Sequence, residues 1–105
     1  MSTDDRRDMP DVLIAIGSVL LDQDDNNAAV ETFSQARSLS HDLTDHHLEA
    51  IALGRLGEAY LRSGDPESAK QSLKKAVDLR RRVPDAHEEA NLARWLAEVD
   101  AAHLS

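Results

Sequence analysis

The chain of 105 residues repeats itself at a spacing of 40 residues, so that much of residues 10–49 is echoed at residues 50–89. The echo pairs small or apolar residues and one aspartate, namely Leu13 with Leu53, Gly17 with Gly57, Leu21 with Leu61, Asp25 with Asp65, Ala29 with Ala69, Ala36 with Ala76 and Leu39 with Leu79. A third copy begins near residue 85 and breaks off before a second half. A fixed period of this size predicts stacked helical hairpins that bury a shared core between neighbouring copies.

The composition supports an all-α fold in one small domain. Hydrophobic residues make up 41% of the chain but aromatic residues only 3%, so alanine, leucine and valine must form the core, as they do between closely packed helices. A chain of this length is one domain. We predict a disordered polar tail at residues 1–8 and a single domain at residues 9–105, with one repeat at about 10–49 and a second at about 50–89.

Apolar residues at spacings of three and four predict five helices. Val12, Leu13, Ile16, Val19 and Leu20 predict a first helix with one buried face, which ends near residue 23. The other stripes are Val30, Phe33, Ala36 and Leu39, then Ala52, Leu53, Leu56, Ala59 and Tyr60, then Leu73, Ala76 and Leu79. Gly64 is predicted to end one helix in the left-handed conformation. Asp65 then caps the next helix, and Pro66 takes its first helical position. Asp85 and Glu88 resemble a capping box, which starts a last helix at about 85–103.

Charge and residue usage exclude several classes of function. The net charge of −8 disfavours binding to nucleic acid, because phosphate contacts are made mainly by lysine and arginine. Residues 1–50 hold 3 basic and 11 acidic residues, whereas residues 51–105 hold 9 of each. The chain has no cysteine, no secretion signal and no apolar run long enough to span a membrane. We therefore expect a cytoplasmic protein with no membrane or nucleic-acid partner.

No motif in the chain predicts a cofactor, a metal site or catalysis. Asp22, Asp24 and Asn26 imitate the start of a calcium loop, but Asn27 and Phe33 stand where the glycine and the closing glutamate belong. His41, His46 and His47 lie close in sequence, but none forms an i, i+4 pair with another histidine in one helix, so solvated side chains are the better interpretation. Nucleophile elbows and phosphate-binding glycine loops are absent, and we predict a protein that is not an enzyme.

The second copy resembles the tetratricopeptide repeat. Its residues are Leu56 and Gly57, then Tyr60, Ala69, Leu73 and Ala76, and the first copy offers Ile16 and Gly17, then Leu20, Ala29, Phe33 and Ala36. The resemblance covers about residues 10–103 and implies a helical-hairpin α-solenoid with two full repeats and a C-terminal capping helix. The spacing of 40 exceeds the family's usual period of about 34 residues and resembles its long-helix variants.

The resemblance also implies a concave groove, lined by the first helix of each repeat, in which a partner protein or peptide binds. Carried onto this chain, the groove holds Asp11, Ile14, Ser18, Ile51, Gly54, Arg55, Glu58, Arg62, Asn91, Arg94, Trp95 and Glu98. Arg55, Arg62 and Arg94 suit an acidic or C-terminal carboxylate peptide, because a guanidinium makes paired, charge-assisted hydrogen bonds. The alternative is that they pair with Glu58 and Glu98. The implied function is a non-catalytic adaptor or scaffold.

Two further functions stay open at this point. Leu92, Trp95 and Val99 form an apolar strip on the last helix, which either folds back on the core or joins two copies in a homodimer. The repeat also resembles the sensor arrays of large bacterial-type regulators, of which this chain would be a stand-alone relative. A basic stripe on the fourth helix suits either solvent or the acidic half of another copy, and it consists of Lys70, Lys74, Lys75, Arg80, Arg81 and Arg82.

Overall fold

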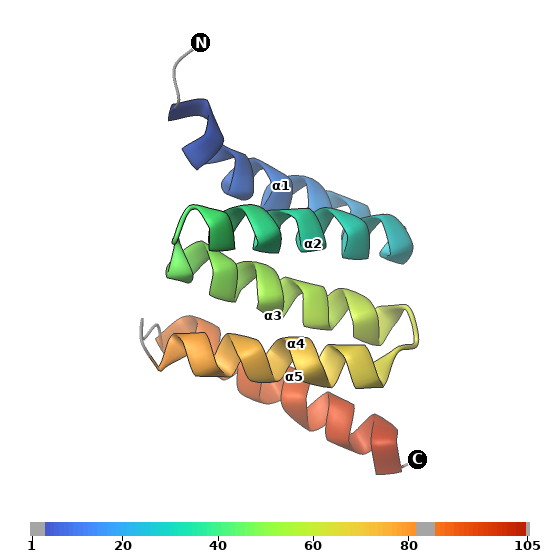
Figure 1. The fold of residues 1–105 in the computed structure, drawn as a ribbon. Helices are drawn as coiled ribbons and strands as arrows, with labels where there is room; N and C mark the ends of the chain where they lie inside the picture. Colours follow the sequence, from blue (N-terminus) through green and yellow to red (C-terminus); the bar gives the residue numbers. More distant parts are fainter. Residues whose placement is uncertain (1–3, 82–85, 105) are drawn as a thin grey trace.

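The described part of the chain forms five α-helices stacked in chain order (Figure 1). The computed structural model describes the backbone of residues 4–81 and 86–104 and the side chains of residues 8–81 and 92–102. The helices are α1 (Asp4–Asp22), α2 (Asn26–Asp42), α3 (His46–Arg62), α4 (Pro66–Arg80) and α5 (Ala86–Leu104). These ranges contain no strand, which confirms the predicted all-α repeat. None of the described helices is long and apolar enough to cross a membrane.

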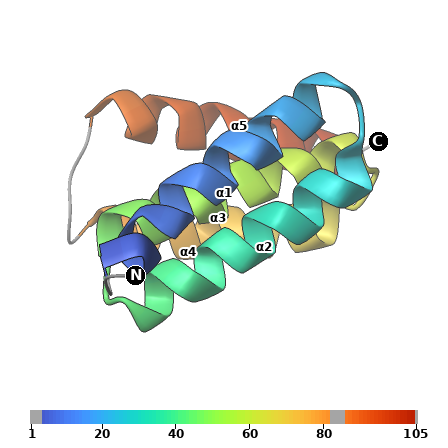
Figure 2. The same cartoon turned by 90° about the horizontal axis from the view of Figure 1, so that it is seen from above.

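The helices form two layers. Each helix packs against the next one in the chain, and α3 also contacts both α1 and α5. Figure 2 shows α5 on one side of the molecule and α2 with α4 on the other, with α3 between them. The odd-numbered helices therefore form a continuous layer, as expected of the first helices of successive repeats.

Three nearly identical turns connect the first four helices at intervals of 20 residues. Each turn has one residue in the left-handed region, and these residues are Asp24 (φ 61°), Thr44 (φ 57°) and Gly64 (φ 85°). The next residue is always an aspartate, whose backbone N–H donates to a carbonyl five residues earlier at 2.9 Å. This hydrogen bond closes a Schellman motif at each helix end. The 40-residue echo is thus built from two similar units of helix and turn.

The aspartate of two turns also begins the following helix. Asp45 accepts a hydrogen bond from the backbone N–H of Leu48, and Asp65 accepts one from that of Ser68, each at 3.1 Å. Hydrogen bonds from the side chain and the backbone of Ser68 lower the pKa of Asp65. Pro66 follows at the first helical position, as predicted. Asp25 begins α2 without a side-chain cap, so backbone geometry alone defines that turn.

Thr44→Gly should stabilise the protein by about 1 kcal/mol, because a β-branched residue is strained at positive φ whereas glycine is not. That gain corresponds to a rise in melting temperature of about 4–8 °C for a domain of this size. Thermal unfolding followed by circular dichroism checks it. Gly64→Ala, at the equivalent turn, should shift the melting temperature in the opposite direction, because its φ of 85° strains any Cβ although the space around it is open. A lower melting temperature for Thr44→Gly would contradict the assignment of strain.

Two glycines allow the helices of each hairpin to approach closely. A Cβ at Gly17 would lie 2.6 Å from the Phe33 ring, and a Cβ at Gly57 would lie 2.6 Å from Cγ of Leu73. Phe33 and Leu73 are completely buried, and both glycines are buried as well. Phe33 lies 40 residues before Leu73, and Gly17 lies 40 residues before Gly57. Small residues therefore mark both helix crossings, because only they let the two helices approach this closely.

The first helix differs from its prediction in two respects. It begins at Asp4, inside the segment 1–8 that was predicted to be disordered, and Pro10 lies within it. Acidic residues in the first turn favour this earlier start, because they complement the positive end of the helix dipole. Val12, Ile16 and Val19 were predicted to be buried but are about half exposed. The predicted capping box at Asp85 and Glu88 lies outside the described side chains.

Candidate functional site

The predicted groove residues lie on the layer of odd-numbered helices. Those of α1 are Asp11, Ile14 and Ser18, those of α3 are Ile51, Gly54, Arg55, Glu58 and Arg62, and those of α5 are Arg94, Trp95 and Glu98. The α3 helix contacts both neighbours, so it forms the middle of this face. Asn91 is on α5, but its side chain lies outside the described residues. Ser18 donates its hydroxyl to the carbonyl of Ile14 at 2.9 Å, which leaves the oxygen of Ser18 as an acceptor.

Glu58 stands at the centre of the charged part of this face. It receives a hydrogen bond from Nη2 of Arg62 at 2.9 Å, and Nη1 of Arg55 lies 3.9 Å from its other oxygen. Both arginines therefore share one carboxylate along two turns of α3. Arg55 and Arg62 thus pair with Glu58, which the sequence analysis gave as the alternative to binding a peptide carboxylate. Such partly exposed pairs contribute only about 0–1 kcal/mol each.

Arg62 also connects the two repeats. Its Nη1 donates to the carbonyl of Leu21 at 3.4 Å, and its own carbonyl accepts from Nδ2 of Asn26 at 3.2 Å. These contacts join the end of α3 to the turn between α1 and α2. Asn26, which imitated a calcium ligand in the sequence, is therefore part of an inter-helix contact.

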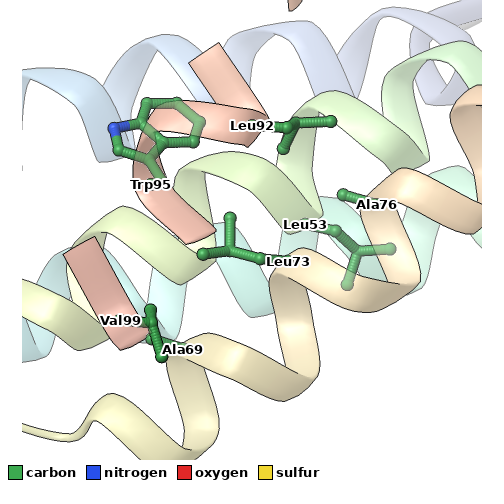
Figure 3. Close-up of a cluster of buried hydrophobic side chains, with 7 residues drawn as sticks. All are labelled: Leu53, Ala69, Leu73, Ala76, Leu92, Trp95 and Val99. Atoms are coloured by element: carbon green, nitrogen blue, oxygen red, sulfur yellow. The ribbon is translucent and has the colours of Figure 1, made fainter. Parts of the chain in front are cut away.

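Trp95 is buried between α3, α4 and α5 and does not offer a surface to a partner. Leu92, Trp95 and Val99 retain at most 4% of their exposure and pack in one cluster with Leu53, Ala69, Leu73 and Ala76 (Figure 3). The apolar strip of the last helix thus folds back on the core, which is the first of its two alternatives, and it leaves these three side chains without exposed surface for a second copy. The physical reason is that α4 and α3 together supply the cover that the strip needs.

Gly54 makes this burial possible from the groove side. A Cβ on Gly54 would lie 3.0 Å from Cδ2 of Leu92 and 3.2 Å from Cζ3 of Trp95, so only glycine leaves room for both at their present positions. The guanidinium of Arg55 lies 5.9 Å from the centre of the Trp95 ring, within the range of a cation–π contact. Arg55 is therefore held at the junction of α3 and α5 by Glu58 on one side and Trp95 on the other.

His41 and His46 approach a buried carboxylate, that of Glu49. Glu49 is 5% exposed, and its Oε2 lies 3.1 Å from Nδ1 of His41 and 3.9 Å from Nε of Arg37. His46 approaches its other oxygen at 3.9 Å. Because these side chains come from α2 and α3, they tie the two repeats together. Over the described side chains, no three histidine, aspartate or glutamate residues form a group that could hold a metal ion.

Sequence reasoning missed a polar hollow on the opposite layer, between α2 and α4. Its lining includes Ser34, Ser38, Tyr60, Ser72 and Lys75. The serines recur four residues apart on both helices, which is a detectable signal. The 40-residue echo hides it, because Ser34 aligns with Lys74 and Ser38 with Asp78.

Comparison with known families agrees with this architecture. Residues 8–82 match the model of the family described as tetratricopeptide repeat. No curated protein and no solved structure matches the chain significantly. The matched segment contains most of α1 and all of α2, α3 and α4, which are the two complete helical hairpins and more than half of the chain. With its crossings at Gly17 and Gly57 and its layer of odd-numbered helices, the chain belongs to the tetratricopeptide repeat family.

Proposed function

We propose that this protein is a non-catalytic adaptor that binds an acidic or C-terminal carboxylate segment of a partner protein along α1, α3 and α5. Tetratricopeptide repeats generally mediate contacts between proteins. The observation that carries the more specific proposal is the shared carboxylate of Glu58, which keeps two arginines of α3 in place on one face. A partner carboxylate entering this face would meet guanidinium groups that are already positioned, which lowers the entropy lost on binding.

The groove is less acidic than the chain as a whole. Its charged side chains are three arginines (Arg55, Arg62 and Arg94) and three acids (Asp11, Glu58 and Glu98). The face is therefore neutral on a chain of net charge −8. Such a contrast gives orientation and specificity more than affinity, because misplaced acidic segments meet like charge elsewhere.

The test is binding of fluorescent peptides that end in acidic residues, each made with a free and with an amidated C-terminus. The double variant Arg62→Glu with Arg94→Glu should weaken binding of the free-acid peptides at least about tenfold, the effect of losing one charge-assisted hydrogen bond. Arg55 is left unchanged, because its packing against Trp95 would confuse loss of charge with loss of stability. The melting temperature of the double variant is measured beside its binding, because Arg62 also donates to the carbonyl of Leu21.

The matched control is Lys74→Glu with Lys70→Glu, which makes the same change of charge on α4. Fluorescence anisotropy should give equal dissociation constants for this control and the unchanged protein. Equal binding by the arginine variant and the control would exclude the groove as the binding face. Equal binding of free and amidated peptides would exclude the terminal carboxylate as the recognised group and leave only acidic side chains.

A further inference from the structure

An apolar stripe runs along the outside of α1. Met9, Val12, Ile16 and Val19 keep 46–54% of their exposure, and no other large hydrophobic side chains of the described residues are as exposed. Their spacing of three, four and three residues places all four on one line along the helix, as at the a and d positions of a coiled coil. The same helix buries Leu21 and Gly17 on its inner side. The first helix is therefore apolar on two faces.

The repeat register shows what normally covers this line. The residues forty positions after Val12, Ile16 and Val19 are Ala52, Leu56 and Ala59 of α3, and all three are buried. Leu56 and Ala59 pack in one cluster with Ala29 and Phe33 of α2. Eighty residues after Val12 and Val19 stand Leu92 and Val99, which are buried against α4. In α3 and α5, the preceding helix of the chain covers the line. None of the described helices covers it on α1.

We propose that the α1 helix of a second copy supplies this cover, so that two chains form a closed, two-fold homodimer with antiparallel α1 helices. The stripe is complementary to itself in this orientation. With the two-fold axis level with residue 14, Met9 faces Val19 and Val12 faces Ile16, so that every apolar side chain of the stripe meets another. An isologous contact of this kind uses one surface twice and cannot grow into a filament.

The helix dipoles favour the antiparallel orientation. Antiparallel pairing sets the two dipoles against one another, whereas a parallel pair would put like ends together. With the axis level with residue 14, the position of Arg6 on each helix lies level with Asp22 of the other.

The open end of the molecule is a weaker place for the stripe to dock. A hollow between α4 and α5 is lined by Val77, Arg81, Ala93 and Leu96 among others, and Arg81 would suit the acidic α1. The apolar part of that hollow on α5 extends only from Leu92 to Leu96, about one helical turn. The stripe extends over ten residue steps, or about 15 Å, so most of it would remain exposed there.

The dimer leaves the proposed groove accessible. Ile14 is two residues from both Val12 and Ile16, which places it about 200° around the helix from each of them. Ser18 has the same relation to Ile16. The groove residues of α1 therefore lie away from the pairing face, and the two proposals can fail independently.

Sedimentation velocity of the full chain over a range of concentrations tests the dimer. The unchanged protein should shift from monomer to twice the monomer mass and no further. Val12→Glu with Ile16→Glu should raise the dissociation constant at least about 100-fold, because each charge would be buried without a partner. Its helix content should stay unchanged, because both side chains are about half exposed in the monomer. Ala97→Glu, an exposed position on α5, is the control and should dimerise normally.

Other outcomes would overturn the proposal. A monomer at several hundred micromolar, or dimerisation that survives Val12→Glu with Ile16→Glu, excludes pairing through the stripe. Masses beyond the dimer, or dissociation by Ala93→Glu, identify a head-to-tail contact with the hollow at α4 and α5 instead. Peptide binding to the groove is measured separately on the same variants, and Val12→Glu with Ile16→Glu should leave it unchanged.

Cysteine cross-linking tests the orientation directly, because the chain has no cysteine of its own. An equal mixture of Val12→Cys and Ile16→Cys chains, one of them tagged, is oxidised and analysed by mass. Antiparallel pairing predicts that the mixed disulfide exceeds either disulfide between identical chains. Predominance of the identical pairs would show parallel helices and overturn the two-fold arrangement.

Discussion

Trp95→Ala should lower the free energy of unfolding by about 3–5 kcal/mol, the largest effect of any single change proposed for this chain. Its ring is 4% exposed and lies against Gly54 of α3 in the cluster that joins α4 to α5. Neither helix can easily close the cavity left by the ring, because Leu92 and Val99 on either side of it are themselves fully packed. A loss of this size is a large part of the stability of a small domain.

Urea unfolding followed by circular dichroism measures this effect. Trp95→Phe, which keeps much of the apolar volume, should lose clearly less and guards against a variant that does not fold at all. Glu98→Ala is the control, since it changes an exposed residue on the same helix and should stay within about 0.5 kcal/mol of the unchanged protein. A loss below about 1 kcal/mol for Trp95→Ala would mean that α5 does not pack on α3 and α4 in solution.

Leu73→Ala should cost about 2–5 kcal/mol, and Gly57→Ala about 1–3 kcal/mol, but the double variant should be less damaged than their sum. The reason is that each change disturbs the same crossing in an opposite sense. A Cβ on Gly57 would collide with Cγ of Leu73 at 2.6 Å, whereas Leu73→Ala removes that atom and leaves space. The remaining neighbour, the carbonyl of Ala69 at 3.4 Å, tolerates the new methyl group.

A double-mutant cycle in urea should therefore give a favourable coupling of at least about 1 kcal/mol. Gly57→Ala combined with Phe33→Leu is the matched control, because Phe33 packs against Gly17 at the other crossing. That pair should add within about 0.5 kcal/mol. Strict additivity of Gly57→Ala and Leu73→Ala would show that the two helices do not cross at these residues.

The crossings themselves could be predicted from the sequence because they occur twice. Gly17 with Phe33 and Gly57 with Leu73 are related by the 40-residue echo, and a helix crossing restricts residue size at every copy. The pairing of Glu58 with Arg62 was also predictable as an alternative, since side chains four residues apart on a helix are neighbours. Local spacing and repetition are sufficient for features of this kind.

Contacts that occur only once in the molecule could not be predicted from the repeat in the sequence. The echo aligns Gly54 with Ile14 and Trp95 with Arg55, so nothing in the repeat indicates that Gly54 and Trp95 meet. The exposure of Val12, Ile16 and Val19 shows a related difficulty. Helical spacing predicts which residues share a face, but burial of that face depends on a neighbouring helix that the spacing does not specify.

The 20-residue interval between the turns restricts how an array of this kind can change in length. Inserting or removing one helix with its turn before α3 would move every later helix from one layer to the other. Helix α3 would then lie in the layer that α2 and α4 now form. The guanidinium groups of Arg55 and Arg62 would then project from the wrong side. Only steps of two helices preserve both layers, because stability and shape in stacked repeats come from neighbour-to-neighbour contacts. Insertions or deletions that preserve the binding face must therefore add or remove about 40 residues at a time.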